Sequence, residues 1–173
     1  GTGELSIFFF FFVKSVTGIY FSEGMIEWAK RNAAIAGVEN VQFLNDNVEK
    51  LPFNDASFSV VFSISAFHHM INSSRVVSDM ARCCKSGGKI STQDIVQYDD
   101  KYVNDFFEKF EKLVDRSHHK TLSSDEFVKH YKDNNIQITQ KLEVEVRLHY
   151  KGYLGHAEQS EDEEEKIEEL LQE

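Results

Sequence analysis

The sequence predicts an α/β fold in which a doubly wound, mostly parallel sheet is flanked by helices. Strand-like and helix-like segments alternate from about residue 15 to residue 95, which is typical of parallel strands joined by crossover helices. Phe58 to Ile64 is an almost unbroken apolar run, as expected for a strand that is buried on both faces. The segment 22–37 carries signals for the start and the end of a helix.

The predicted elements follow in order along the first half of the chain. Ser22 is suited to cap the first helix and Gly37 to end it, and the apolar residues between them fall at helical spacing. A second helix is expected from Arg75 to Cys84, ended by a serine and two glycines. We expect strands near residues 15–20, 41–45, 58–64 and 89–95, with all four parallel.

The second half of the sequence has a different character. Helical patterns occur over residues 102–114 and 124–133, and strict alternation of apolar and polar residues runs from Leu142 to Tyr150. Alternation with a period of two predicts a strand with one face in water, which we place within residues 136–150.

Acidic residues concentrate at the end of the chain. The formal net charge is −10, and residues 158–173 hold nine acidic residues and one lysine. The rest of the chain is therefore nearly neutral, which argues against a nucleic-acid surface. We predict an α/β domain over residues 1–157 and an acidic helix over residues 158–173.

The cysteines and the most apolar segment indicate a cellular compartment. Cys83 and Cys84 are adjacent, and neighbouring cysteines rarely form a disulfide because the geometry is strained. Unpaired thiols fit a reducing compartment. Leu5 to Val13 is far shorter than the roughly 20 residues that a membrane helix needs, and it lacks the flanks of a signal peptide. We therefore predict a cytoplasmic protein without a membrane span.

Five segments resemble the successive motifs of class I S-adenosylmethionine-dependent methyltransferases. They read GTGELSI, TGIYFSEGMIEWAKRNAAIAGVENVQF, NVEKLPFNDASFSVVFS, SAFHHM and ARCCKSGGKI. The similarity covers about residues 1–150 and is closest to the small-molecule branch that includes the ubiquinone and menaquinone biosynthesis type. It implies a Rossmann-like fold and methyl transfer from S-adenosylmethionine to a small-molecule acceptor, with S-adenosylhomocysteine as the product. An insert at about residues 99–122 would cap the substrate.

The resemblance also implies which residues bind the cofactor. Gly1 and Gly3 match the glycine loop that faces the methionine part of the cofactor. Tyr20 stands where the family has an acidic residue for the ribose hydroxyls, and Asn47 and Val48 stand at the pair beside the adenine. An uncharged phenol in place of a carboxylate loses about 1.5–3 kcal/mol, which is on the order of 10- to 100-fold in affinity.

Two further positions follow from the resemblance. Ser65 lies in the cofactor loop after a strand, and His69 borders the methyl-transfer region and is the candidate base. His68 and His69 could also be read as a metal pair, but adjacent residues on a strand or loop point apart and no carboxylate-rich partner segment is evident. We therefore predict no metal. His118 and His119 fall in the insert, where we expect a solvated loop with a substrate contact as the alternative.

The first strand of the family has no counterpart in the sequence, and neither does the last. That first strand lies between two others in the family's sheet, and neighbouring strands must be about 4.8 Å apart. Either residues precede Gly1 in a longer chain, or the segment SIFFFFFV serves as a replacement strand. Direct pairing of segments 15–20 and 58–64 would instead mark a rearranged sheet.

The residues leave two other functions open. A methyltransferase-like binding or scaffold protein without catalysis is favoured by Tyr20, by Asn47 and by the absent strand. A nicotinamide-dependent oxidoreductase is the poorer alternative, because it would have glycine at positions 1, 3 and 6 after a first strand, and position 6 is serine.

Overall fold

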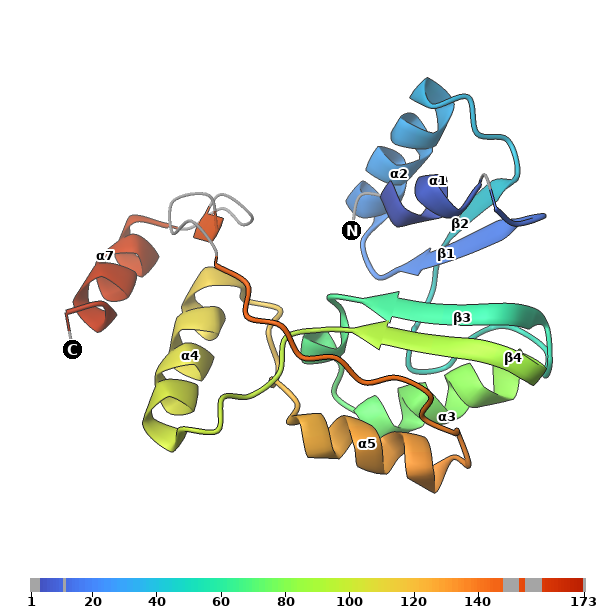
Figure 1. Ribbon diagram of the computed structural model, residues 1–173. Coiled ribbons are helices and arrows are strands. Elements are labelled where there is room, and N and C mark those ends of the chain that lie inside the picture. The colour runs from blue at the N-terminus through green and yellow to red at the C-terminus, as the bar shows by residue number, and fades with distance from the viewer. Residues whose placement is uncertain (1–3, 11, 148–152, 155–159, 173) are drawn as a thin grey trace. The chain divides into compact units, whose positions relative to one another are not determined.

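The structure is a computed structural model that describes residues 4–10, 12–147, 153–154 and 160–172. Its elements are, in chain order, α1 (Glu4–Phe10), β1 (Val16–Tyr20), α2 (Glu23–Ile35), β2 (Val41–Asn45), β3 (Phe58–Ile64), η1 (Phe67–His69), α3 (Ser73–Cys83), β4 (Cys84–Gln93), α4 (Lys101–Val114), α5 (Ser124–Asp133) and α7 (Glu161–Leu170) (Figure 1). The chain forms two compact units, Gly1–Phe62 with Ser74–Ser91, and Ser63–Ser73 with Thr92–Glu173.

The first unit contains a parallel pair of strands joined by a helix. Strands β1 and β2 pair in parallel, with Val16 opposite Val41 and Tyr20 opposite Asn45. One face of α2 covers them, and the buried cluster consists of Ile26, Ala29, Ala33, Val38 and Phe43. Gly37 ends the helix with φ +66°, the left-handed conformation that favours glycine. The helix and both strands predicted from the sequence are confirmed.

A second two-stranded sheet is formed by β3 and β4. Their arrows point the same way in Figure 1, as the prediction of parallel strands requires. Gly88 lies within the first half of β4, close to the backbone of β3. A Cβ atom there would lie 2.8 Å from the carbonyl oxygens of Lys85 and Ser59, so only glycine fits.

The phenylalanine-rich segment is a helix and not a replacement strand. Helix α1 covers Glu4–Phe10, so the part of SIFFFFFV that the structure describes does not enter a sheet. Phe9 packs against Phe62 with ring centroids 4.9 Å apart, whereas Phe8 and Phe12 are 59% and 71% exposed. A helix satisfies its own backbone hydrogen bonds, which a lone strand cannot do. Strands β1 and β3 belong to separate sheets, so the direct pairing that would mark a rearranged sheet does not occur.

The prediction of a strand within residues 136–150 is wrong for the part of this segment that the structure describes. Residues 136–147 are neither helix nor strand, and residues 148–150 lie outside the described residues. The alternating apolar residues Leu142, Val144 and Val146 are 75%, 67% and 66% exposed. Alternation produces a strand only where a neighbouring strand supplies the ladder, and among the described residues none pairs with this segment.

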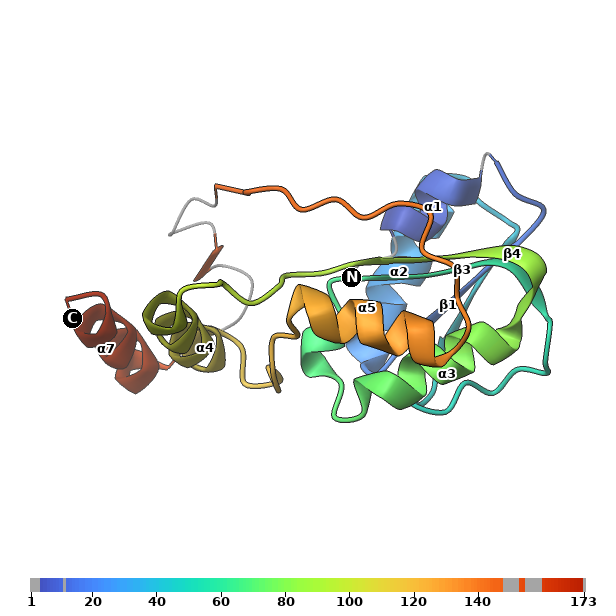
Figure 2. The ribbon, with the colours of Figure 1, turned by 60° about the horizontal axis from the view of Figure 1, so that its bottom comes forward.

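In the second unit the acidic end of the chain packs on α4. Helices α4 and α7 lie side by side in Figures 1 and 2, with Phe110, Val114, Ile167 and Leu170 buried between them. The guanidinium of Arg116 donates two hydrogen bonds of 2.7 Å to the carboxylate of Glu163. Glu163 also closes a capping box with Ser160 at the start of α7.

Candidate active site

The second unit gathers polar groups where β3 and β4 end. Ser65 follows β3 and has φ +47°, a left-handed conformation that non-glycine residues seldom adopt. Its amide donates to the carbonyl of Gln93, the last residue of β4, at 2.9 Å. This sharp turn directs the chain into η1, which carries His68 and His69. Local strain of this kind clusters at functional sites.

Asp94 fixes the position of η1. One carboxylate oxygen accepts hydrogen bonds of 2.8 Å from the backbone amides of Ala66 and Phe67. The other oxygen accepts from the amide of Ile95 at 2.9 Å and lies 2.6 Å from Nδ1 of His68. The Asp94 side chain is only 1% exposed, so these four contacts replace its hydration.

His68 is held as a hydrogen-bond donor to Asp94. Burial by itself lowers the pKa of His68, but the hydrogen bond to Asp94 and the charges of Asp94, Glu111 and Asp115 outweigh it. The net effect raises the pKa of His68 above 6.5. The proton on Nδ1 therefore points at the carboxylate, and Nε2 faces away from it.

His69 is held differently, by Ser117. The Ser117 hydroxyl lies 3.1 Å from Nδ1 of His69 and donates to Oδ1 of Asp115 at 2.5 Å. A hydroxyl has one proton, so in this arrangement Nδ1 of His69 donates to the hydroxyl and Nε2 keeps a lone pair. Burial, and next the charge of His68, lower the pKa of His69, which favours the neutral ring.

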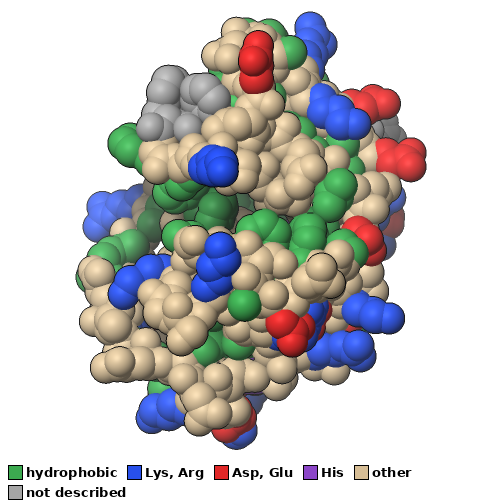
Figure 3. Space-filling model, turned by 90° about the vertical axis from the view of Figure 1, so that its right-hand side faces the viewer, with side chains coloured by type: hydrophobic (Ala, Val, Ile, Leu, Met, Phe, Trp, Pro, Cys, Tyr) green, Lys and Arg blue, Asp and Glu red, His purple; other side chains and the backbone are tan. Residues whose placement is uncertain are grey.

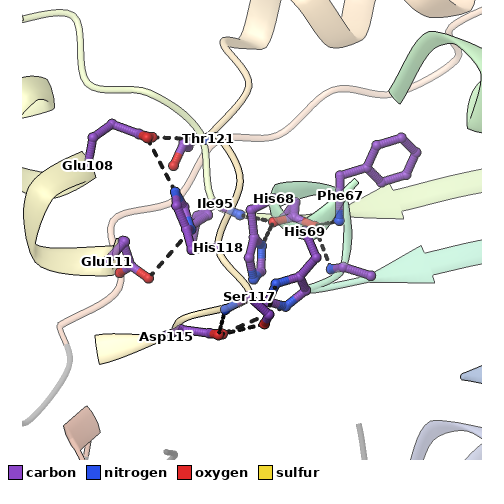
Figure 4. A network of polar contacts seen from close by, with 12 residues as sticks. Phe67, His68, His69, Ile95, Glu108, Glu111, Asp115, Ser117, His118 and Thr121 are labelled. Carbon is purple, nitrogen blue, oxygen red and sulfur yellow. Dashed lines mark hydrogen bonds and ion pairs between the residues drawn. The ribbon is translucent and has the colours of Figure 1, made fainter. Parts of the chain in front are cut away.

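A more deeply buried acid–histidine layer supports the half-buried His68 and His69 (Figure 4). The His118 side chain is fully buried, with Nε2 3.3 Å from Glu108 and Nδ1 4.0 Å from Glu111. Its ring stacks on that of His68 with centroids 5.7 Å apart. Tyr153 donates to Glu111 at 2.5 Å, and burial is the main cause of the raised pKa of Glu111. His119 is exposed, so the expected solvated loop is correct for His119 and wrong for His118.

The first unit holds the other sequence-predicted residues at the ends of β1 and β2. Tyr20 ends β1, and burial raises the pKa of its hydroxyl, while a hydrogen bond with Ser6 opposes that shift. Asn45 ends β2, and its amide group lies 3.1 Å from the carbonyl oxygen of Tyr20. The side-chain oxygen of Asn47 accepts from the amide of Glu49 at 2.8 Å. Val48, the next residue, is half-buried.

These residues fit S-adenosylmethionine unevenly. The amide nitrogen of Asn47 is exposed and makes no hydrogen bond among the described residues, so it is available to a base edge. Tyr20 offers no carboxylate to a ribose, and its hydroxyl already bonds to Ser6. Gly1 and Gly3 lie outside the described residues. The adenine end therefore has a hydrogen-bonding group available in Asn47, whereas the ribose end has only a phenol that is already bonded.

Sequence reasoning missed several residues of this site, namely Asp94, Glu108, Asp115 and Ser117. The expectation that His68 and His69 point apart is also wrong, because the 3-10 turn brings their ring centroids within 4.0 Å. Asp94 had a usable signal, since it follows the last residue of a strand, where ligand-binding groups gather in such sheets. Asp115 and Ser117 had none, because they approach η1 only through the fold.

The alternation of helices and strands, with strained and polar residues at strand ends, defines an α/β fold of the doubly wound class. Within that class the chain belongs to the methyltransferase domain family, whose model matches residues 1–92. The resemblance seen in the sequence is thereby confirmed.

Three relatives illustrate the similarity. The chain is 26% identical over 167 residues to an uncharacterized methyltransferase, YcgJ, from Bacillus subtilis. Over 82 residues it is 37% identical to 27-O-demethylrifamycin SV methyltransferase from Amycolatopsis mediterranei and 32% identical to demethylmenaquinone methyltransferase from Listeria monocytogenes. These matches cover 96% of the chain for the first relative and 47% for the others. The chain spans 66%, 30% and 35% of their respective lengths.

Solved structures support the fold. The crystal structure of YcgJ from Bacillus subtilis superposes with a TM-score of 0.88, at 28% identity over 99% of this chain and 73% of that chain. A structure from Bacillus halodurans superposes with a TM-score of 0.84 over 96% of this chain and 72% of that one, at 22% identity, and supports the fold alone. None of the helices in the described part of the chain has the length and apolar character that crossing a bilayer requires.

Proposed function

We propose that the protein transfers a methyl group from S-adenosylmethionine to a small-molecule acceptor, with His69 as the general base. The observation that carries this proposal is the state of the His69 ring. Ser117 occupies its Nδ1, burial and the neighbouring His68 lower its pKa, and its Nε2 keeps a lone pair. A base that is neutral near pH 7 can accept the proton of a hydroxyl or of an acidic carbon.

The surrounding residues keep His69 ready for this step. Asp115 accepts a hydrogen bond from the Ser117 hydroxyl, so the Ser117 oxygen in turn accepts one from Nδ1 of His69, which fixes the tautomer of that ring. After Nε2 takes a proton the ring is cationic, and Oδ2 of Asp115, 3.9 Å from Nε2, stabilises that charge. His68 is tied to Asp94 and positions the turn that carries His69.

The cofactor residues proposed here are those of the family's motifs. Gly1 and Gly3 would contact the methionine part, Tyr20 the ribose, and Asn47 and Val48 the adenine. Ser65, in the loop after β3, would complete the cofactor site. When bound, the cofactor supplies a methyl group that is already activated on a sulfonium, so the protein's task is mainly to position the acceptor.

The acceptor and the compartment follow from the same considerations. The relatives named above include enzymes whose names give a rifamycin and a menaquinone precursor as substrates, which supports a small organic acceptor. Basic and acidic side chains are interspersed on the face seen in Figure 3, which fits a protein that does not bind nucleic acid.

A cytoplasmic location is proposed from the free thiols of Cys83 and Cys84. We also propose one domain over residues 1–157, with a substrate-capping insert at about 99–122, followed by the acidic segment 158–173.

A methyltransferase-like binding protein without catalysis is the second candidate. The hydroxyl of Tyr20, at the position of the family's ribose-binding carboxylate, is bonded to Ser6 of α1, and this observation favours weak cofactor binding.

Calorimetric titration with S-adenosylmethionine and S-adenosylhomocysteine separates the two candidates. One-to-one binding of both compounds is expected. Transfer of a labelled methyl group to phenolic acceptors should then be measurable, and His69→Gln should abolish that transfer. Absence of binding at millimolar cofactor would refute the enzyme and leave the binding protein.

A further inference from the structure

Two histidines and an aspartate converge in the second unit in a way that methyl transfer does not require. His68, His69 and Asp115 each offer one ligand atom, and these three atoms lie within 4.8 Å of one another. Their side chains are 13%, 26% and 36% exposed, so the cluster is reachable from solvent without being fully hydrated.

The hydrogen bonds around the cluster occupy Nδ1 of each ring. Nδ1 of His68 donates to Asp94, and Nδ1 of His69 donates to the Ser117 hydroxyl. In the neutral form of each ring, the lone pair is therefore on Nε2. Asp115 accepts the amide and hydroxyl of Ser117 on Oδ1, so Oδ2 is the oxygen that faces Nε2 of His69.

With both rings neutral and Asp115 ionised, the cluster brings three acceptors together, and a bound cation would relieve their mutual repulsion. A histidine ligand whose other nitrogen donates to a carboxylate is the usual arrangement around protein-bound zinc, and Asp94 supplies that carboxylate for His68. Two imidazoles and one carboxylate also match the donor set of sites that keep open coordination positions.

We propose that His68, His69 and Asp115 form a binding site for one divalent transition-metal ion such as Zn²⁺, with Nε2 of each ring and Oδ2 of the aspartate as ligands. Donor atoms around such an ion lie about 2.0–2.2 Å from it and hence roughly 3–3.5 Å from one another. Small side-chain rotations close the present spacing. The remaining positions on the ion would be taken by water or by an oxygen ligand.

The site goes beyond the proposed function and is independent of it. Nε2 of His69 has one lone pair, so a bound ion prevents this nitrogen from taking a proton. Zinc would accordingly inhibit a reaction that uses His69 as base, while metal binding itself needs neither cofactor nor acceptor.

The test is calorimetric titration of the tag-free, full chain with Zn²⁺ and Co²⁺ near neutral pH. One ion per chain is expected. His69→Gln and Asp115→Asn should each weaken binding at least about tenfold, the lower range seen even for outer-sphere partners. His119→Gln, an exposed histidine in the same loop as Ser117, is the matched control and should bind as the unchanged protein does. Mg²⁺ should not compete, because it requires oxygen ligands.

The Co²⁺ spectrum distinguishes this site from the cysteines. Visible bands of a nitrogen- and oxygen-ligated ion are expected, without the near-ultraviolet charge-transfer band of a thiolate ligand such as Cys84. Circular dichroism shows whether each variant keeps its helices, and His69 and Asp115 are exposed enough for both variants to fold. Absence of one-to-one binding, equal affinity of His69→Gln and the unchanged protein, or a thiolate band would overturn the proposal.

Discussion

Replacing Asp94 by asparagine tests how the site is held together. The carboxylate accepts four hydrogen bonds, from the amides of Ala66, Phe67 and Ile95 and from His68. Asparagine keeps one oxygen and puts an NH₂ group where the other stood. In either orientation of the amide, two of the four donors then face the NH₂ group, which cannot accept their hydrogen bonds.

The magnitude follows from counting those contacts. Hydrogen bonds to a charged acceptor contribute about 1.5–3 kcal/mol each, so losing two costs roughly 3–6 kcal/mol of unfolding free energy. This is a large part of the roughly 5–15 kcal/mol typical of a domain. The pKa of His68 should also fall below its ordinary value, because burial, which lowers it, is then opposed only by more distant charges.

Urea denaturation and an NMR titration of the His68 ring measure both effects. In the unchanged protein the raised pKa means that protonated His68 stabilises the fold. That contribution is fully present below pH 6.5 and is lost as the pH rises through the folded-state pKa. Asp94→Asn should reverse this pH dependence, because a His68 pKa below its ordinary value makes protonation of the ring destabilising. Asp99→Asn, an exposed neighbour, is the control and should change stability by less than about 0.5 kcal/mol. An unshifted His68 pKa in Asp94→Asn would refute the reasoning.

Three further outcomes are expected. Asn47→Ala should weaken S-adenosylmethionine binding by roughly 1–3 kcal/mol and Tyr20→Asp should strengthen it by a similar amount; equal calorimetric affinities would exclude this rim as the cofactor site. The rate of methyl transfer should fall in acid only below pH 6.5, because the pKa of His69 is lowered, and a decline centred above 6.5 would contradict His69 as the base. Ile167→Ala should cost about 2–5 kcal/mol in thermal or urea unfolding, since this side chain is fully buried, whereas exposed Glu164→Ala should have little effect.

The sequence was sufficient to predict the helices and strands whose positions depend on residues near one another in the chain. Helix α2 follows its apolar spacing and ends at Ile35, two residues before Gly37. Helix α5 covers Ser124–Asp133 as expected, and Ser123 and Glu126 form a capping box at its start. Strands β1, β2 and β3 also match their predicted positions closely. These features depend on residues within one turn or one strand of each other.

Features that depend on distant partners could not be predicted. Alternation around Val144 indicated a strand, but no neighbouring strand pairs with it among the described residues. The sequence predicted that His118 is a solvated loop residue. In the fold it is buried and lies within hydrogen-bond distance of Glu108, ten positions earlier on α4. Ser117 and His69 are 48 positions apart, and no local pattern links them.

The attachment of α7 to α4 responds differently to acid and to salt. The two hydrogen bonds from Arg116, aided by those from Ser160, lower the pKa of Glu163 to about 2, so this carboxylate keeps its charge well into the acid range. Acidification should therefore leave α7 docked. Concentrated salt screens the exposed Arg116–Glu163 pair but does not weaken the packing of Ile167. At high ionic strength and neutral pH, apolar packing is thus the contact that keeps α7 attached to α4.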